Sequence, residues 1–587
     1  MNNKNTEYVT IHVEKLGKKI KAPKGSNLGL ILSKTIGFPL PCGGSGFCGK
    51  CLVKIIQGKT SPPTSLEKLR GYGTNGYRLA CQVKVLGDIV VEVPQIPREY
   101  IKVPKICINI PLKRIKPLFK VIELNCSKTP KDVNLRKYFI TSKAFREIIK
   151  TSGKAHAIEI NDIIYLVKES LTKPIVCLID LGSSKIAIHL IDYRSLTLVH
   201  EDIIINPQVR IGMDIMSRLA SILHGRESTT SIKEMTIKAI EERLRKLEKE
   251  INMKLNDIVA IAIAGNSAIT SILLEEPINT LARKPFQPTM SATYLSLSSE
   301  LGFKEISNAL TIVMPLIGGF VGGDAFMDYV ATSYLEEEKG SKYMVIDLGV
   351  NTEIVLVNED KVFFTSTPAG PAFEGHITSG VHYPQGAIIN VRVRSINGGK
   401  IVFEWKTTDN SKPRGLLAAG AISILHELLE HKIMDYSGKL NRYNRIVNGI
   451  KAIEIVPETE TAHGKPIVIT QQDIRELQKA IAAVKTAWRI LLQVSNVKVE
   501  EIDRVYIAGT FGTTINPIHA RSLMIVPPVD VENIIPTGNL VLQGLKISIF
   551  DSDYFMKILE RINAFMHINL VSYRDFNRMW IENLKFR

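Results

Sequence analysis

Four of the seven cysteines form one short pattern near the N-terminus. Cys42, Cys48 and Cys51 lie within ten residues of one another, and Cys81 follows after 29 further residues. Glycines lie between the first three cysteines, and glycine lets a backbone wrap closely around a bound group. Four thiolates at this spacing are typical of a 2Fe–2S cluster, because the plant-type ligand pattern differs by only one residue in the first gap. The sequence therefore predicts a 2Fe–2S centre.

Other interpretations of this segment are weaker. A structural zinc site or a set of reduced buried cysteines would also use thiols, but zinc sites favour two Cys-x2-Cys pairs and only one is present. The glycines also fit G-x-G-x-x-G and nearly fit a P-loop, but both motifs need a strand that leads into a helix. The cysteines explain the glycines better. The remaining cysteines, Cys107, Cys126 and Cys177, match no ligand set, and Cys177 lies in an apolar run typical of a core.

The elements around the cysteines suit a small ferredoxin. Residues 7–13 alternate between polar and apolar as a strand does, 52–56 and 89–94 also have strand character, and 26–35 can form a short helix. This order predicts a β-grasp 2Fe–2S ferredoxin domain over residues 1–96.

A second pattern is a duplicated hairpin in the rest of the chain. Residues 175–192 and 343–358 each contain an apolar run, then Asp-Leu-Gly, then a turn and a second apolar run. The two aspartates, Asp180 and Asp347, are 167 positions apart, which predicts two similar subdomains. Backbone N–H groups of such turns can bind phosphate oxygens. The aspartates would repel phosphate, so they are better suited to hold a hydrated Mg²⁺ or to orient the attacking water.

Further segments favour a nucleotide cleft over two ordinary hairpins with turn aspartates. Residues 258–264 and 504–508 are apolar runs that end in glycine turns, at Gly265 and at Gly509. Apolar residues repeat at helical spacing after Thr470, and Asp473 completes a capping box there. Strands that alternate with helices make the fold class α/β.

Composition and charge narrow the class of protein. The chain has 587 residues, with 45% hydrophobic and 23% charged, which is ordinary for a globular protein. The net charge of +17 is spread along the chain, and its densest basic cluster lies in a proline-containing stretch, 97–125, that reads as a linker. We find no nucleic-acid motif, no signal peptide and no stretch long enough to span a membrane. A soluble, cytoplasmic protein without a nucleic-acid partner is expected.

The motifs resemble those of a known family. The duplicated Asp-Leu-Gly hairpins and the glycine turns look like the ASKHA fold of sugar kinases, heat-shock chaperones and actin, and the whole chain resembles the reductive activators of corrinoid proteins. Besides the cysteines, the resemblance rests on NPQ at 206–208, GMDIMSR at 212–218, KPFQP at 284–288, GFVGGD at 319–324, AGPAFEG at 369–375, ITQQDIR at 469–475 and GN at 538–539.

The resemblance implies an α/β multidomain architecture. It predicts a ferredoxin domain at 1–96, a linker at 97–125, a small middle domain at 126–172 and an actin-like, duplicated ATPase domain at 173–587. The two halves of the ATPase domain would divide near residue 340. Related ATPase domains suggest a homodimer.

The resemblance also implies an activity. The protein would be an ATP-hydrolysing iron–sulfur oxidoreductase that passes one electron from its cluster to the cobalt(II) of a corrinoid protein and regenerates cobalt(I). A low-potential donor would reduce the cluster. Two alternatives remain: a small-molecule kinase with a fused ferredoxin, and a redox-sensing binding protein gated by nucleotide.

These inferences assign roles to single residues. Asp180 and Asp347 are the candidate catalytic residues, serving Mg²⁺ and water. The remaining candidates are ligands of the two cofactors, the 2Fe–2S cluster and ATP: Cys42, Cys48, Cys51 and Cys81 for the cluster, Gly182, Ser183, Ser184, Gly349 and Asn351 for the phosphates, and Gly509 and Gly512 beside the nucleoside.

Overall fold

The structure is a computed structural model of the whole chain. It describes residues 7–586 except 39, 41–43, 45, 47–50, 70–71, 74, 94–107, 127–137, 152, 213, 285, 338–340, 382–383, 398–399 and 448. The chain divides into two compact units. The first contains residues 1–100 and 205–239, and the second contains 101–204 and 240–587.

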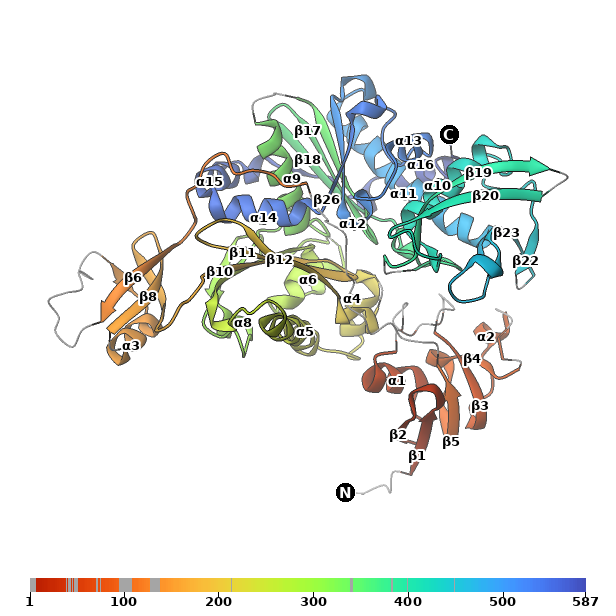
Figure 1. Ribbon diagram of the computed structural model, residues 1–587, viewed down its shortest axis with the longest axis horizontal. Coiled ribbons are helices and arrows are strands. Elements are labelled where there is room, and N and C mark those ends of the chain that lie inside the picture. Colours follow the sequence, from red (N-terminus) through yellow and green to blue (C-terminus); the bar gives the residue numbers. More distant parts are fainter. Residues whose placement is uncertain are drawn as a thin grey trace. The chain divides into compact units, whose positions relative to one another are not determined.

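The first unit contains a five-stranded mixed sheet with the order β2-β1-β5-β3-β4 (Figure 1). Its strands are β1 (Tyr8–Val13), β2 (Lys18–Pro23), β3 (Leu52–Thr60), β4 (Tyr77–Leu79) and β5 (Val85–Glu92), and helix α1 spans Leu28–Ile36. Strand β1 is antiparallel to β2 and parallel to β5, with alternate side chains buried. This is the β-grasp arrangement that the sequence predicts.

A smaller sheet in the second unit has the order β6-β8-β9-β7. It consists of β6 (Lys120–Cys126), β7 (Phe139–Ile140), β8 (Gly153–Ile160) and β9 (Ile163–Lys168), with helix α3 (Ser142–Lys150) beside β9. The first strand begins at Lys120, inside the stretch expected to be linker, because residues 120–126 pair along their whole length with β8.

Two six-stranded sheets form the rest of the core, and they repeat one topology. The first has the order β12-β11-β10-β13-β15-β14 and the second β26-β25-β16-β17-β18-β27. In each, the predicted hairpin supplies the two adjacent strands that begin the repeat: β10 (Ile175–Leu181) with β11 (Lys185–Asp192), and β16 (Tyr343–Asp347) with β17 (Asn351–Asn358). Numbered along the chain within each half, both sheets share the strand order 3-2-1-4, and strand 4 is followed by one more parallel strand, β15 in the first sheet and β26 in the second. The duplication read from the hairpins therefore extends to whole sheets.

The other strands of these sheets have the following bounds: β12 (Leu198–Ile205), β13 (Ile258–Gly265), β14 (Tyr294–Leu297), β15 (Leu310–Val313), β18 (Lys361–Pro368), β25 (Arg504–Ala508), β26 (Ile534–Gly538) and β27 (Met566–His567). Strands β13 and β25 lie parallel to β10 and β16. They are buried on both faces, which explains their continuous apolar runs. Cys177 in β10 is completely buried, as its apolar surroundings predict.

Two helices connect the sheets. Helix α9 (Gly323–Glu336) contacts β13 of the first sheet and both β16 and β17 of the second. Helix α14 (Leu540–Phe550) contacts β10, β11 and β13, and the two helices pack against each other (Figure 1). Their buried side chains belong to one hydrophobic cluster that includes both sheets. The loops at the carboxyl ends of β10 and β16 are thus held by a shared core.

Further elements extend the two halves. Helix α4 (Ile215–Leu223) belongs to the first compact unit, and α5 (Thr229–Glu250) begins in the first unit and ends in the second. The first half also carries α6 (Ser267–Leu273), α7 (Asn279–Ala282) and α8 (Ser298–Leu301). The second half carries β19 (Ala387–Asn397), β20 (Lys400–Thr407), β21 (Gly415–Leu416), β22 (Arg445–Val447), β23 (Ile450–Val456), β24 (Ile467–Thr470), α10 (Ala418–Glu430), α11 (Gln471–Ser495), α12 (Gly509–Gly512), α13 (Pro517–Ser522), α15 (Ser552–Glu560) and α16 (Phe576–Glu582). None of the helices within the described residues is both long enough and apolar enough to cross a membrane.

The capping box at the start of helix α11 also anchors a neighbouring loop. Asp473 accepts hydrogen bonds from the Thr470 N–H at 2.9 Å and from the Thr470 hydroxyl at 2.7 Å. Its other carboxylate oxygen accepts from the N–H and the hydroxyl of Thr378, at 2.8 and 3.0 Å. Asp473 therefore ties the start of α11 to the loop that follows residues 369–375.

Replacement of this buried carboxylate should weaken the second half of the core. We expect Asp473→Ala to lower the free energy of unfolding by about 2–3 kcal/mol, because four donors lose their acceptor. Urea unfolding followed by tryptophan fluorescence reports the change, since Trp488 lies on the same helix. Glu476→Ala, on the exposed face of α11, is the control and should cost less than about 0.5 kcal/mol. Equal effects of the two variants would contradict the role of Asp473.

Candidate functional site

Two of the four predicted cluster ligands lie in the described part of the ferredoxin domain. Cys51 and Cys81 are buried, and their Sγ atoms are 3.2 Å apart, so the fold brings these two predicted ligands together. Cys42 and Cys48 lie outside the described residues. Helix α1 passes close to this site, because a Cβ atom on Gly29 would lie 2.8 Å from the backbone nitrogen of Cys81.

A buried ion pair supports the strand that leads to Cys81. Arg78 donates to both carboxylate oxygens of Glu67, at 2.9 and 3.1 Å, and to the carbonyl oxygen of Ser61 at 2.8 Å. Glu67 also accepts from the Leu79 N–H at 3.0 Å, and these donors hold the pKa of Glu67 below its usual range even though burial acts in the opposite direction. The pair fixes the backbone next to Cys81. Sequence reasoning gave Glu67 no role.

The candidate nucleotide site lies where the two hairpins end. Asp180 and Asp347 occupy the same position in the duplicated sheets, near the carboxyl ends of β10 and β16. The glycine two residues after each aspartate is also in a matching environment. A Cβ atom on Gly182 would lie 2.8 Å from the Lys185 carbonyl oxygen, and one on Gly349 would lie 2.8 Å from that of Asn351. Both turns are therefore too tight for a larger residue.

The first aspartate is oriented by a residue from the other half of the chain. The side-chain amide of Asn539 donates to Asp180 Oδ2 at 2.5 Å, while its Oδ1 accepts from the Leu542 N–H at 2.9 Å and caps helix α14. This hydrogen bond opposes the rise in pKa that burial causes, and the pKa of Asp180 lies at about 6. The resemblance included the Gly538-Asn539 pair, but no sequence pattern indicated which residue Asn539 contacts.

The second hairpin is held by the tract at 369–375 and by β25. The Gly370 N–H donates to the Val350 carbonyl oxygen at 2.8 Å, so this tract supports the turn itself. A Cβ atom on Gly509 would overlap the Asp347 carboxylate, and Gly509 has a φ of +83° that favours glycine. A Cβ atom on Gly512 would overlap the carbonyl oxygen of Ile507, which lies in β25, the strand that precedes Gly512. The roles of both glycines beside a nucleoside stay predictions.

Three further carboxyl groups surround these aspartates, and sequence reasoning missed their role. Asp324 and Asp328 lie one turn apart on the same face of α9, and Glu353 pairs directly with Asp347 across β16 and β17. Burial, reinforced by neighbouring carboxylates, raises the pKa of Asp324 to about 7 and that of Asp347 to about 8. The same causes raise the pKa values of Asp328 and Glu353 well above their usual range. Only the packing of α9 between the sheets brings this group together.

Buried polar atoms without a hydrogen-bond partner indicate which ligand groups this site could bind. Among the described residues, the Ser184 hydroxyl in the first turn is buried without a hydrogen-bond partner, and no N–H group donates to either carboxylate oxygen of Asp328. A hydroxyl in a glycine turn suits a phosphate oxygen, and carboxylate oxygens without such a donor suit a hard divalent cation. The residues therefore fit a phosphate group accompanied by Mg²⁺.

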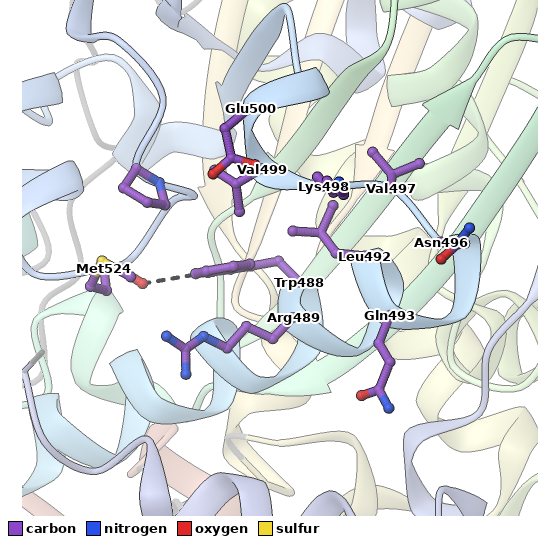
Figure 2. Close-up of a pocket in the computed structure, with 11 residues that line it drawn as sticks. Trp488, Arg489, Leu492, Gln493, Asn496, Val497, Lys498, Val499, Glu500 and Met524 are labelled. Atoms are coloured by element: carbon purple, nitrogen blue, oxygen red, sulfur yellow. Dashed lines mark hydrogen bonds between the residues drawn. The ribbon is translucent and has the colours of Figure 1, made fainter.

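Two other features of the described residues do not belong to this site. A pocket of about 520 Å³ lies at the end of α11 and is lined by Trp488, Leu492 and Met524 (Figure 2), but none of the phosphate-turn residues lines it.

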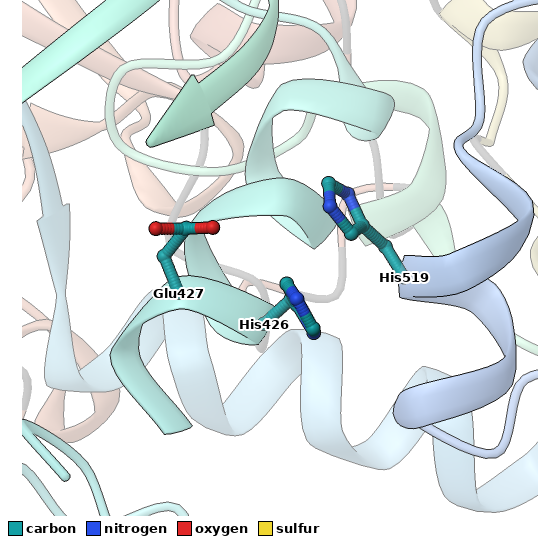
Figure 3. Close-up of side chains that lie close together, drawn as sticks. All are labelled: His426, Glu427 and His519. Atoms are coloured by element: carbon teal, nitrogen blue, oxygen red, sulfur yellow. The ribbon is translucent and has the colours of Figure 1, made fainter. Parts of the chain in front are cut away.

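His426, Glu427 and His519 also lie close together on α10 and α13 (Figure 3). The two imidazole rings stack at 4.4 Å with their planes 25° apart, and one ligand atom from each of the three residues lies within 4.8 Å of the others. One Glu427 oxygen already accepts from the Val393 N–H at 2.7 Å. The described geometry is that of a stacked histidine pair.

Comparison with known proteins gives the class of each region. Residues 11–86 match the 2Fe–2S iron–sulfur cluster binding domain. Residues 176–337 match the RACo middle region, and residues 341–587 match the C-terminal domain of RACo, described as the ASKHA domain. The class is thus a 2Fe–2S ferredoxin joined to an ASKHA domain.

Whole proteins with this composition are similar to the chain. The corrinoid activation enzyme RamQ of Eubacterium limosum is 26% identical over 94% of this chain and 95% of its own length. The [Co(II) methylated amine-specific corrinoid protein] reductase of Methanosarcina barkeri is 24% identical over 70% of this chain and 76% of its own. A solved structure, the reductive activator for corrinoid,iron-sulfur protein, covers 98% of both chains with a TM-score of 0.74 and 23% identity.

These findings confirm the resemblance to the reductive activators of corrinoid proteins. They confirm the α/β multidomain fold class, with a 2Fe–2S ferredoxin domain and a C-terminal ASKHA domain, while the matched middle region is residues 176–337 and not the predicted small domain at 126–172. They also confirm the class of enzyme that the sequence predicts, an iron–sulfur protein with an ASKHA ATPase domain. The individual site residues stay predictions.

The buried carboxyl groups make stability depend on pH when no cation is bound. The folded protein binds more protons than the unfolded chain above pH about 4, because folding raises the pKa of Asp347 to about 8 and that of Asp324 to about 7. The stability that this protonation contributes is complete below the unfolded pKa of about 3.9 and is lost as the pH rises through the folded values.

In EDTA, the melting temperature of the protein should therefore fall between pH 6 and pH 9, and Asp347 alone should account for about 2–3 kcal/mol of the loss. Calorimetry or thermal-shift measurement checks this, and millimolar Mg²⁺ should reduce the fall. Asp347→Asn should flatten the pH dependence, whereas Asp360→Asn, at an exposed ion pair, should leave it unchanged. A wild-type profile as flat as that of Asp347→Asn would contradict the prediction.

Proposed function

We propose that this protein is an ATP-dependent reductive activator of corrinoid proteins, which passes one electron from a 2Fe–2S cluster to cobalt(II) and regenerates cobalt(I). The observation that carries the proposal is the presence in one chain of a 2Fe–2S ferredoxin domain and a duplicated ASKHA domain with paired aspartates. The names of the full-length relatives support it.

The proposal gives the ferredoxin domain the role of electron carrier. Cys42, Cys48, Cys51 and Cys81 would hold the cluster, which accepts and donates one electron at a time. Plant-type clusters have reduction potentials near about −400 mV, and reduction of cobalt(II) in a corrinoid requires a still lower potential. The transfer is therefore uphill, and nucleotide binding or hydrolysis must favour an arrangement in which it proceeds.

The ASKHA domain would bind the nucleotide at its two turns. Backbone N–H groups and hydroxyls at Gly182, Ser183, Ser184, Gly349 and Asn351 would contact the phosphates, and Gly509 and Gly512 would lie near the nucleoside. Asp180 and Asp347 would hold Mg²⁺ through its water ligands or orient the water that attacks the terminal phosphate. Asn539 keeps Asp180 turned toward this position.

The proposed partners follow from this chemistry. The substrate is a corrinoid protein in its cobalt(II) state, and a separate low-potential donor must reduce the cluster again after each transfer. We further propose that the protein acts in the cytoplasm as a homodimer. The proposal also includes the domain limits. The ferredoxin domain would span 1–96, the linker 97–125, the small middle domain 126–172 and the ATPase domain 173–587, whose two halves would meet near residue 340.

Absorbance of cobalt tests the function directly. The chemically reduced protein is mixed anaerobically with a cobalt(II) corrinoid protein, with and without Mg-ATP. The cobalt(I) band should appear only with ATP, and Asp347→Asn should lower both ATP hydrolysis and cobalt(I) formation by at least about 100-fold. Asp360→Asn, which removes a carboxylate from an exposed ion pair, should match the wild type.

Absence of cobalt(I) with a competent corrinoid protein and a reduced cluster would contradict the proposed function. Phosphorylation of a small molecule would then favour a kinase, and nucleotide-dependent partner binding without electron transfer would favour a redox sensor.

Single cysteine replacements test the cluster ligands. Cys81→Ser should lose the visible absorbance and most of the iron of the purified protein, because a serine hydroxyl binds iron much less well than a thiolate. Cys107→Ser, outside the four-cysteine pattern, should keep the iron content of the wild type. Iron analysis and electron paramagnetic resonance of the reduced protein measure the difference, and equal iron in the two variants would exclude Cys81 as a ligand.

A further inference from the structure

The pocket of about 520 Å³ at the end of α11 is separate from the phosphate turns (Figure 2). Its walls come from three segments: the C-terminal part of α11, residues 496–500, and Met524 with Pro528. A volume of this size is typical of pockets that bind small molecules. A molecule bound here would therefore be different from the nucleotide.

The buried wall of this pocket is apolar. Trp488 and Leu492 lie one turn apart on α11 and are 2% and 7% exposed, and Val497, just after the helix, is 6% exposed. The indole N–H of Trp488 already donates to the carbonyl oxygen of Met524 at 3.4 Å (Figure 2). The wall therefore offers apolar surface and suits a hydrocarbon chain or an aromatic ring.

Arg489 brings a positive charge to the same pocket. Its guanidinium lies over the Trp488 ring, 5.5 Å from the centroid, and it donates to the side-chain oxygen of Asn583 at 2.7 Å. Both of these partners are uncharged. Burial lowers the pKa of Arg489, and no carboxylate of the described residues opposes this effect. A guanidinium has five N–H donors, so the bond to Asn583 leaves donors for a ligand.

Two lysines add to the positive charge around Arg489. Lys485, one turn earlier on α11, is 1% exposed, and its Nζ donates to the carbonyl oxygen of Lys585 at 3.3 Å. Lys498 lines the pocket and is exposed. Glu500 also lines the pocket, but it is exposed, so water and salt screen its charge. Buried cations without a carboxylate are costly in a folded protein, and a bound anion would compensate them.

We propose that this pocket binds a small organic anion with an apolar body, such as a medium-chain or aromatic carboxylate. The anionic group would accept hydrogen bonds from Arg489, with Lys498 near it at the rim, and the apolar body would lie against Trp488 and Leu492. Arginine can bind a carboxylate through two parallel N–H donors, so the pocket would select molecules that carry both features. Neither the nucleotide nor the cluster is needed for this binding.

Calorimetric titration of the full-length protein with 2-naphthoate tests the site. The matched probe is 2-naphthylmethylammonium, which has the same ring system and the opposite charge. 2-Naphthoate should bind once per chain and at least about 10-fold more tightly than the cation, because only the anion can accept from Arg489. Arg489→Met keeps an apolar contact with Trp488 but removes the charge, and it should weaken the binding of 2-naphthoate at least about 10-fold. Arg561→Met, at an exposed ion pair, should bind it as the wild type does.

Lys498→Met keeps the test decisive if Arg489→Met does not fold, because Lys498 is exposed. This variant should keep the melting temperature of the wild type and should bind 2-naphthoate about 2- to 5-fold more weakly. Absence of 2-naphthoate binding by the wild type, or equal binding of the two probes, would overturn the proposal. Unchanged binding of 2-naphthoate by folded Arg489→Met or by Lys498→Met would also overturn it.

Discussion

The concentration of negative charge at one place in the ASKHA domain is the constraint on which its structure depends. Five carboxyl groups from β10, β16, β17 and α9 lie close enough to raise one another's pKa values. Ionised carboxylates so close together repel one another, so the rest of the fold must hold them in place. The duplicated sheets and the helices between them supply this support through a continuous apolar core.

The contacts that orient Asp180 and Asp347 come from uncharged groups and do not neutralise the carboxylates. Asn539 donates to Asp180 from the far half of the chain, the Gly370 N–H holds the turn after Asp347, and Gly509 brings the backbone close to the Asp347 carboxylate. None of these groups carries a charge. A lysine or arginine in their place would neutralise the site permanently and would compete with Mg²⁺ for the same oxygens. Neutral donors orient the carboxylates and keep their charge available for a cation.

Local patterns predicted the hairpins, the ferredoxin and the capping box, because the residues that define each of them are close in sequence. Asp180, Asp347 and the glycines that follow them belong to one repeated turn, and Thr470 with Asp473 belongs to one helix start. Asp328 and Glu353 could not be found in this way. Asp328 reads as an ordinary helical residue, and only the packing of α9 against both sheets brings it to Asp347. Glu67 is similar, since it lies on the short helix Ser65–Leu69 and its partner Arg78 lies on β4.

The linker that follows the ferredoxin domain is attached to the nucleotide site through one helix. The Ile108 N–H donates to the Thr537 carbonyl oxygen at 3.0 Å, just before Asn539, and the Leu118 N–H donates to that of Ile549 at 2.7 Å, near the end of α14. Between them the Ile110 N–H donates to the Gln543 side chain at 3.1 Å. Helix α14, whose N-cap residue Asn539 donates to Asp180, is thus the helix along which residues 108–118 lie. A displacement of α14 would therefore also displace residues 108–118, because backbone and side-chain hydrogen bonds join them to this helix and to the strand end before it.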